Sequence, residues 1–173
     1  MNLSIKIWLS LTCLLFTTWC SAQEETSISS LRPPTLLGAL APEYPVEKWI
    51  NKASEKNDKK LTLLYFWSTS NPLPAYVDIP RFNKFAKEFK DRLNIIGLTA
   101  DPVEYITDIE PAIEFPYAYA PQAVKNFKIK VYGYCYILNA RGKVIYEGFP
   151  LLEGEIISEK FLKKLIRKHY KKK

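Results

Sequence analysis

Residues Leu61 to Trp67 constrain the fold most, because they form a run of apolar and aromatic side chains between two polar loops. A short continuous run of this kind is typical of a central strand that is covered on both faces of a sheet. After the following loop, four apolar side chains recur at helical spacing, with charged residues between them: Phe82, Phe85, Ala86 and Phe89. This pattern predicts an amphipathic helix that packs against the sheet.

The rest of the chain continues this alternation of strands and helices. We expect further strands at 93–99, 115–119, 134–138 and 143–147, the second of them at a sheet edge, and helices from Asp101, from Pro121 to Phe127 and from about Glu155 to Tyr170. Helical character is also expected from Val46 to Ser54. A chain of 173 residues suggests a single domain. Alternating elements that close on a hairpin predict an α/β fold, a three-layer α/β/α sandwich with a central mixed sheet.

The first 22 residues have the composition of a secretory signal peptide. Lys6 precedes an apolar run, Ile7 to Trp19, that is too short to span a membrane comfortably, and cleavage is expected after Ala22. Cys20 also permits a lipoprotein in which this cysteine is acylated, although the bulky Trp19 before it disfavours that alternative. Both alternatives place the protein outside the cytoplasm, in the periplasm or on the envelope.

Three segments follow the signal peptide: a flexible polar linker at 23–35, a folded domain at 36–170 and a basic tail at 171–173. Cys135 is the one cysteine of the mature chain, so no disulfide can form within it. We expect this thiol to be buried, with an intermolecular bond as the alternative. No metal or cofactor is expected, because the mature chain has a single cysteine and a single histidine, His169.

The net charge of +7 is concentrated in the predicted last helix and in the basic run from Lys168 to Lys173. Such a run is most often a solvated helix face. It can also hold a protein near anionic lipids or polymers, so envelope association through this helix is one predicted interaction. Nucleic acid is not expected as a partner of an exported chain.

Four motifs in order resemble those of a known family. They are GALAPEY at 38–44, FWSTSNPLP at 66–74, IPRFN at 79–83 and FKIKVYGYCYILNARGK at 127–143. Over about residues 36–166, the chain is similar to the exported thioredoxin-like thiol-disulfide reductases of the TlpA and ResA type. This resemblance implies a thioredoxin fold, with an active-site loop between the first central strand and the helix that follows it.

Two features of the family's active site are replaced in this chain. Asn71 and Pro74 stand where the resemblance places the cysteines of a C-x-x-C motif, and Gly133 stands where it places a cis-proline. Without two thiols, dithiol exchange has no chemistry to use at this loop. We interpret Asn71 as a helix N-cap and Pro72 as the first helical residue, and we expect a trans Tyr132–Gly133 bond. The chain is therefore predicted to be a degenerate member of the family.

Three hypotheses about function follow. The first is a redox-inactive protein, not an enzyme, that binds another protein or peptide outside the cytoplasm. Its candidate binding residues are those of the family's substrate groove, Trp67, Ser70, Asn71, Tyr132 and Gly133, and an aromatic edge that comprises Tyr105, Phe115, Tyr117 and Tyr119, for which core packing is the alternative. The second is a thiol-disulfide oxidoreductase that works through Cys135 alone. The third is a lipid-anchored assembly factor.

Overall fold

The computed structural model describes residues 30–54 and 60–170. The predicted signal peptide, the linker up to residue 29, residues 55–59 and the basic tail lie outside the described residues. The described residues from Pro33 onward form one compact unit. Within the described part of the chain, no helix is both long and apolar enough to cross a bilayer. The predicted segment boundaries stay predictions.

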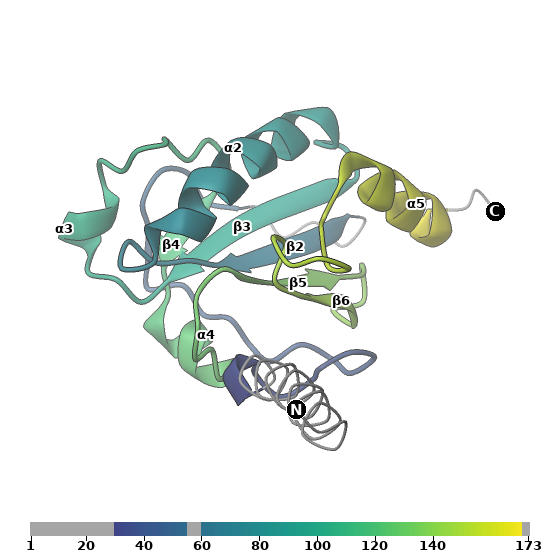
Figure 1. The fold of residues 1–173 in the computed structure, drawn as a ribbon, viewed down its shortest axis with the longest axis horizontal. Helices are drawn as coiled ribbons and strands as arrows, with labels where there is room; N and C mark the ends of the chain where they lie inside the picture. The colour runs from purple at the N-terminus through teal and green to yellow at the C-terminus, as the bar shows by residue number, and fades with distance from the viewer. Residues whose placement is uncertain (1–29, 55–59, 171–173) are drawn as a thin grey trace, which may run out of the picture. The chain divides into compact units, whose positions relative to one another are not determined.

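One six-stranded mixed sheet organises the fold. Its strand order is β1-β4-β3-β2-β5-β6, in which β2, β3 and β4 run parallel and the other neighbours pair antiparallel. The strands are β1 (Lys48–Trp49), β2 (Leu61–Phe66), β3 (Leu93–Thr99), β4 (Tyr117–Tyr119), β5 (Tyr134–Leu138) and β6 (Val144–Gly148). Figure 1 labels the helices α2 (Pro72–Glu88), α3 (Val103–Ile106), α4 (Pro121–Asn126) and α5 (Glu159–His169).

Helices cover both faces of the sheet (Figure 1). α2 and α5 lie on one face, where β2 contributes Leu61, Leu63 and Tyr65 to a buried cluster. α4 lies on the other face, where β2 contributes Leu64 and Phe66. Because side chains alternate across a strand, a strand buried on both faces is apolar at nearly every position. This explains the apolar run and confirms the predicted α/β sandwich.

The predicted helical segment from Val46 to Ser54 is wrong. It contains the strand β1, which pairs antiparallel with β4. Trp49 packs on one face of the sheet and Ile50 on the other, which is the alternation of a strand. Asn51 anchors the end of the strand, because its Oδ1 accepts a hydrogen bond from the amide of Tyr117 at 3.2 Å. Pairing with β4 therefore outweighs the local helical pattern.

The C-terminal helix begins later than its sequence pattern predicted. α5 starts at Glu159 because Ser158 caps it: the Ser158 Oγ accepts a hydrogen bond from the amide of Phe161 at 3.1 Å. Ahead of the cap, Gly154 has a φ of +81°, which interrupts helical backbone. Ile157 is fully buried but lies before the first turn of the helix.

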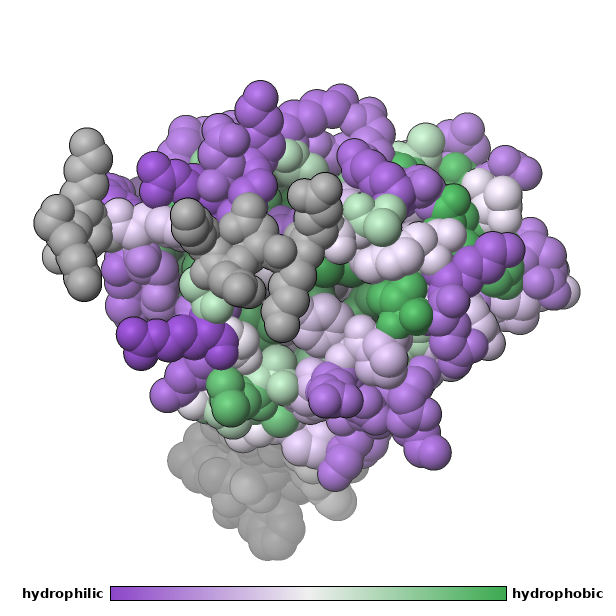
Figure 2. All heavy atoms as spheres, turned by 180° about the vertical axis from the view of Figure 1, so that it is seen from behind, coloured by the Kyte–Doolittle hydropathy of each residue, from purple (hydrophilic) through white to green (hydrophobic). Residues whose placement is uncertain are grey.

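The face of the sheet opposite α2 and α5 is only partly covered, because α4 has six residues. A cavity of about 500 Å³ lies on that face between Trp49, Ile96 and Leu138. No cysteine or histidine is among the described residues that line it. The molecule seen from behind in Figure 2 is hydrophilic over most of its rim, with apolar side chains gathered near the middle.

Candidate functional site

The carboxyl ends of the parallel strands β2 and β3 meet at one edge of the sheet. Residues Trp67 to Asn71 follow β2 and lead into α2, and Asp101 lies two positions after the end of β3. Crevices at the carboxyl ends of strands are the usual ligand sites of open α/β sheets. This loop is also the one to which the family resemblance points.

Asp101 holds this loop in place. Its carboxylate accepts hydrogen bonds from Ser68 Oγ, at 2.9 Å to each oxygen, from the Thr69 amide at 2.6 Å and from Thr69 Oγ1 at 2.8 Å. Ser70 joins through its Oγ, 2.7 Å from Ser68 Oγ. Hydrogen bonds to a carboxylate are strong because one partner is charged, so the loop is ordered before any ligand arrives. We call Ser68 to Asn71 together with Asp101 the Asp101 network.

Sequence reasoning missed this role of Asp101. The pair Asp101 and Pro102 was expected to begin a helix with Asp101 as its cap, but α3 begins at Val103 and Pro102 is the N-cap. The Asp101 amide donates to Thr99 Oγ1 at 3.1 Å, and its side chain turns to Ser68 and the rest of the loop. The signal that would have found it is topological, because two parallel neighbouring strands bring the residues that follow them side by side.

Asn71 links the start of α2 to the loop before β5. It occupies the N-cap position with Pro72 as the first helical residue, as predicted. Its side chain makes no capping hydrogen bond; Nδ2 donates instead to the carbonyl oxygen of Tyr132 at 3.2 Å. Pro74 lies in the first turn of α2, and neither Asn71 nor Pro74 supplies a thiol. The position that the family gives to a cysteine thus joins two loops in this chain.

Gly133, directly before β5, is hydrogen-bonded to the end of β2. Its bond with Tyr132 is trans, as expected, because the one cis bond among the described residues is Glu110–Pro111. Gly133 has a φ of +94°, and its amide donates to the carbonyl oxygen of Phe66 at 2.7 Å. Proline has neither that φ nor an amide hydrogen. The family's proline therefore does not fit this backbone.

The residues predicted to line a substrate groove fall into two groups. Ser70 is exposed, and Asn71 and Tyr132 are half-buried, so these three reach the surface at the Asp101 network. Partial burial and the negative charge of Asp101 raise the pKa of Tyr132. Trp67 is 1% exposed and lies in the core under α2, and Gly133 is buried as well. The structure corrects these two placements, because Trp67 and Gly133 support the loop from within.

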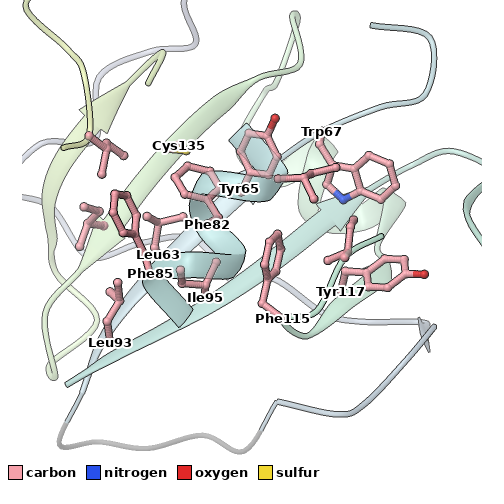
Figure 3. Close-up of a cluster of buried hydrophobic side chains, with 14 of the residues drawn as sticks. Leu63, Tyr65, Trp67, Phe82, Phe85, Leu93, Ile95, Phe115, Tyr117 and Cys135 are labelled. Atoms are coloured by element: carbon pink, nitrogen blue, oxygen red, sulfur yellow. The ribbon is translucent and has the colours of Figure 1, made fainter. Parts of the chain in front are cut away.

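Of the two alternatives for the aromatic group, core packing is confirmed for Phe115, Tyr117 and Tyr119, and the predicted edge strand is wrong. β4 is paired on both sides, with β1 and β3, so it is not an edge strand. Phe115 and Tyr117 lie in the core (Figure 3) with exposures of 1% and 5%, and the Tyr117 hydroxyl donates to a backbone carbonyl at 3.0 Å. Tyr119 is half-buried against the same core. Tyr105 alone of this group is exposed.

Two exposed tyrosines lie in the helices that follow the Asp101 network in the chain. Tyr76 in α2 is 58% exposed and Tyr105 in α3 is 65% exposed. α2 follows Asn71 and α3 follows Asp101, so both helices begin at the network. Tyr76 is not among the binding residues predicted from the sequence. We define the Asp101 surface as the accessible residues of this region: Thr69, Ser70, Asn71, Tyr76, Tyr105 and Tyr132.

Cys135 lies in the core on β5, opposite Tyr65 of β2 (Figure 3). Its side chain is 0% exposed, so the thiol is buried, as expected. Burial and, second, the negative charge of Asp78 raise the pKa of Cys135 well above its usual value, and Arg81 opposes the shift. The thiolate is the nucleophilic form of cysteine. In this conformation the nucleophilic form is disfavoured.

A buried ion pair lies on α2, where Asp78 is 0% exposed and pairs with Arg81 one turn further along. Arg81 also donates to the carbonyl oxygen of Pro150 at 3.2 Å. Burial raises the pKa of Asp78 to about 6, although the Arg81 guanidinium opposes the shift. Sequence reasoning missed this pair. Its signal was the position of Asp78, three residues after Ala75 and four before Phe82, on the apolar face of the helix.

Among residues 30–54 and 60–170, no group of three or more His, Cys, Asp or Glu side chains is placed to hold a metal ion. His169 is exposed at the end of α5, where partial burial and the charge of Lys168 lower its pKa. The candidate chemistry of the described residues therefore rests on hydroxyl, carboxyl and amide groups at the surface and on one buried thiol.

No model of a protein family matches this chain, and no curated protein matches it. Solved structures do match, and they define a class, the thioredoxin-like proteins. A thiol-disulfide isomerase from Corynebacterium glutamicum has a TM-score of 0.62 at 16% identity, over 79% of this chain and 98% of its own. A putative thiol:disulfide interchange protein DsbE from Chlorobium tepidum has a TM-score of 0.58 at 18% identity, over 75% and 97%. A 2-Cys peroxiredoxin from Plasmodium vivax has a TM-score of 0.58 at 15% identity, over 80% and 86%.

At these identities the likeness shows the fold alone. The chain has a thioredoxin-like α/β fold, which confirms the predicted fold class and the fold part of the family resemblance. The other features predicted from the resemblance, degeneracy and export, are not tested by these structures.

The prediction that the chain is not an enzyme is contradicted. The structures that it resembles are those of a thiol-disulfide isomerase, an interchange protein and a peroxiredoxin, so its fold is one that redox enzymes use. The missing cysteines at Asn71 and Pro74 exclude only a dithiol reaction at that loop. The comparisons therefore give no support to the prediction of a binding module without redox activity.

Proposed function

We propose that this protein binds a segment of another exported polypeptide at the Asp101 surface. The observation that carries the proposal is the exposure of Tyr76 and Tyr105 in the two helices that begin at the loop held by Asp101. A tyrosine presents a large apolar ring and a polar hydroxyl with few rotatable bonds. It therefore gains contact area with a partner at a low cost in conformational entropy.

The order of the loop supports the same conclusion. The hydrogen bonds of Asp101 hold Ser68 and Thr69 in place before a polypeptide binds, and Asn71 connects the loop to Tyr132. Binding to a preorganised surface loses less free energy to the ordering of side chains and loops. Exposed Thr69 and Ser70 add hydroxyl groups that can donate to or accept from a polypeptide backbone.

We infer further that the loop at Asn71 and Pro74 is a former dithiol site. Asn71 stands in the place of a cysteine in the resembled family, and Gly133 in the place of its proline. The predicted signal peptide supports action outside the cytoplasm, with Cys20 as a route to the envelope when it is acylated.

The comparisons favour a second candidate function, a thiol-disulfide oxidoreductase that works through Cys135. In this reaction the Cys135 thiol transfers its proton to solvent, and its sulfur attacks a disulfide of the bound polypeptide. A mixed disulfide forms, and one thiolate of the polypeptide leaves. The thiol is 0% exposed, so β5 has to become accessible first. Both candidate functions begin with a polypeptide at the Asp101 surface.

Affinity capture tests the first proposal. The wild type, the double variant Tyr76→Ser with Tyr105→Ser, and a matched control are immobilised and exposed to the envelope fraction of an exporting host without reductant. The control is Leu37→Ser with Leu40→Ser, because these leucines are 61% and 71% exposed and lie outside the Asp101 surface. A partner kept by the wild type and the control but lost by the tyrosine variant is the expected result. Equal capture by all three proteins, or capture by none, contradicts the proposal.

The same capture with Cys135→Ser tests the second candidate. A partner that only dithiothreitol releases, and that Cys135→Ser does not retain, establishes covalent thiol chemistry. A partner that Cys135→Ser retains equally, and that salt releases without reductant, contradicts the oxidoreductase and leaves the binding function standing.

A further inference from the structure

Helix α5 carries its apolar and cationic side chains on opposite faces. Its apolar side chains lie against the core between the helix and the sheet: Phe161, Leu162, Leu165 and Ile166. Four of its exposed cations lie at one position and at four, seven and eight positions after it, which places them on one side of the helix: Lys160, Lys164, Arg167 and Lys168. The core fixes the orientation of the helix, so the cationic side faces away from the protein.

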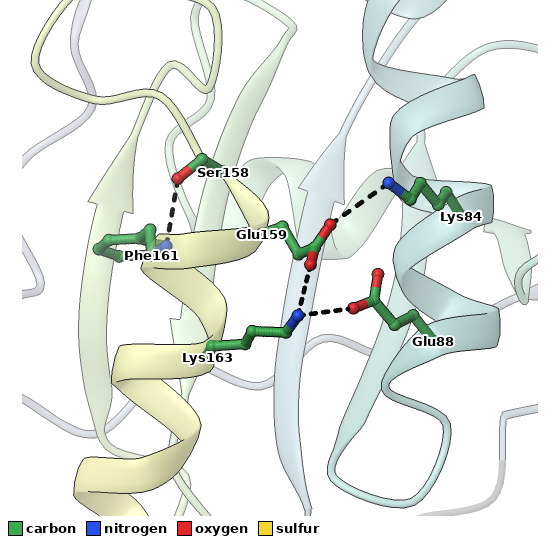
Figure 4. A network of polar contacts seen from close by, with 6 residues as sticks. All are labelled: Lys84, Glu88, Ser158, Glu159, Phe161 and Lys163. Carbon is green, nitrogen blue, oxygen red and sulfur yellow. Dashed lines mark hydrogen bonds and ion pairs between the residues drawn. The ribbon is translucent and has the colours of Figure 1, made fainter.

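These exposed cations are not neutralised by neighbouring acids. Figure 4 shows where the acids near α5 are engaged: Glu159 pairs with Lys163 and, at 3.3 Å, with Lys84, and Lys163 also pairs with Glu88 at 3.3 Å. Within the part of the chain that the structure describes, Lys160, Lys164, Arg167 and Lys168 make no ion pair, unlike Lys163. The face therefore presents four uncompensated positive charges.

An apolar groove with a cationic rim lies beside this face. It has a volume of about 500 Å³ and is lined by Phe89, Ile166 and Tyr170, with Arg92 and Arg167 among its cations. The Arg92 guanidinium lies 5.0 Å from the centre of the Tyr170 ring, and the Tyr170 hydroxyl donates to the Arg92 carbonyl oxygen at 3.3 Å. The groove thus offers apolar and aromatic surface directly next to positive charge.

We propose that the cationic face of α5 and this groove bind a membrane that contains anionic phospholipid. Lys and Arg attract anionic headgroups, and tyrosine is enriched where apolar and polar layers of a bilayer meet. A phospholipid joins a phosphate headgroup through glycerol to apolar acyl chains, which matches the cationic rim and the apolar floor. A soluble polyanion such as heparin satisfies the cations but leaves the floor unmatched.

The groove at Phe89 and the Asp101 surface lie at opposite ends of α2. Asn71 is the N-cap of this helix and Phe89 is its C-cap, and its 17 residues span about 25 Å. A membrane bound at the Phe89 end therefore leaves the Asp101 surface open. The proposal does not depend on the proposed function.

The test uses residues 33–173, the compact unit that contains every strand of the sheet and both buried clusters. Binding is measured by cosedimentation with vesicles of phosphatidylcholine alone and with vesicles that contain one-third phosphatidylglycerol. The variant is Lys164→Gln with Arg167→Gln. The control is Lys48→Gln with Lys125→Gln, which removes the same charge from the exposed residues of β1 and α4. Circular dichroism checks that each protein is folded.

We expect the wild type to bind only the vesicles with phosphatidylglycerol, and added salt to weaken this binding. Each cation near an anionic bilayer contributes about fivefold to the partition constant, so the α5 variant should bind roughly 25-fold more weakly while the control changes far less. Equal binding to both vesicles, equal losses in the variant and the control, or no binding overturns the proposal. In a competition experiment, heparin and unlabelled phosphatidylglycerol vesicles are added at equal total negative charge to protein bound to vesicles. If heparin displaces the protein from the vesicles as effectively as the added vesicles do, the lipid assignment is overturned.

Discussion

The Asn71 side chain donates a hydrogen bond to the carbonyl oxygen of Tyr132 at 3.2 Å, across 61 residues of sequence. This bond joins the start of α2 to the loop before β5. In the loop before β5, the amide of Gly133 also donates a hydrogen bond to the carbonyl oxygen of Phe66, the last residue of β2. Hydrogen bonds thus connect the two loops in which the family resemblance places the active-site cysteines and the cis-proline.

Replacement of Asn71 should lower the free energy of unfolding. Asn71→Ala removes the donor to the Tyr132 carbonyl, and the expected loss is about 1 kcal/mol. Asn71→Asp should lose at least as much free energy of unfolding at neutral pH, because its carboxylate has no hydrogen to donate to the Tyr132 carbonyl oxygen. Urea unfolding of both variants and the wild type measures these losses. Equal stability of the three proteins would contradict the bond.

Gly133 should tolerate neither alanine nor proline. At a φ of +94°, a Cβ costs about 1–3 kcal/mol of backbone strain. Gly133→Pro should cost about 3 kcal/mol or more, because it also removes the amide that donates to Phe66. Urea unfolding should rank the wild type above Gly133→Ala and Gly133→Pro last. A Gly133→Pro variant as stable as the wild type would show that this loop can adopt the backbone conformation that the resembled family has at its cis-proline.

Asp78 should make stability fall as the pH rises. Burial raises its pKa from 3.8 to about 6, so the folded state holds this proton more tightly than the unfolded state. Its favourable contribution is complete below the unfolded pKa and is lost as the pH rises through about 6. This shift corresponds to about 3 kcal/mol.

The comparison with Asp78→Asn isolates this effect, because asparagine does not titrate. Urea unfolding between about pH 4 and pH 7.5 should show the wild type losing about 2 kcal/mol relative to Asp78→Asn, because part of the full loss occurs below pH 4. A constant difference between the two proteins over this range would mean that the pKa of Asp78 is the same in the folded and the unfolded state.

Arg81 should matter most when Asp78 is charged. Arg81→Met leaves a buried carboxylate without its partner, and the expected loss at neutral pH is about 3–5 kcal/mol. The double variant with Asp78→Asn should recover most of this loss, because no charge is then left in the core. A double-mutant cycle by urea unfolding measures the coupling. Additive losses would contradict the ion pair.

Much of the fold could be predicted, because the spacing of apolar side chains along the chain indicates most of its strands and helices. The apolar run from Leu61 to Trp67 predicts a strand buried on both faces, and the spacing of Phe82, Phe85 and Phe89 predicts the helix that covers it. The pattern from Val46 to Ser54 misled, because a strand of two residues is too short to show alternation and is decided by its partner β4.

The sequence by itself determined the α/β class, the absence of thiols at Asn71 and Pro74, and the burial of Cys135 inside a strand. Tertiary structure alone decided that Asp101 holds a loop 32 residues away, that Asn71 bonds to Tyr132 and that Phe115 and Tyr117 lie in the core. The reason is physical. Periodicity records which side of an element is apolar, whereas strand order and register decide which polar groups meet, and no local pattern encodes them.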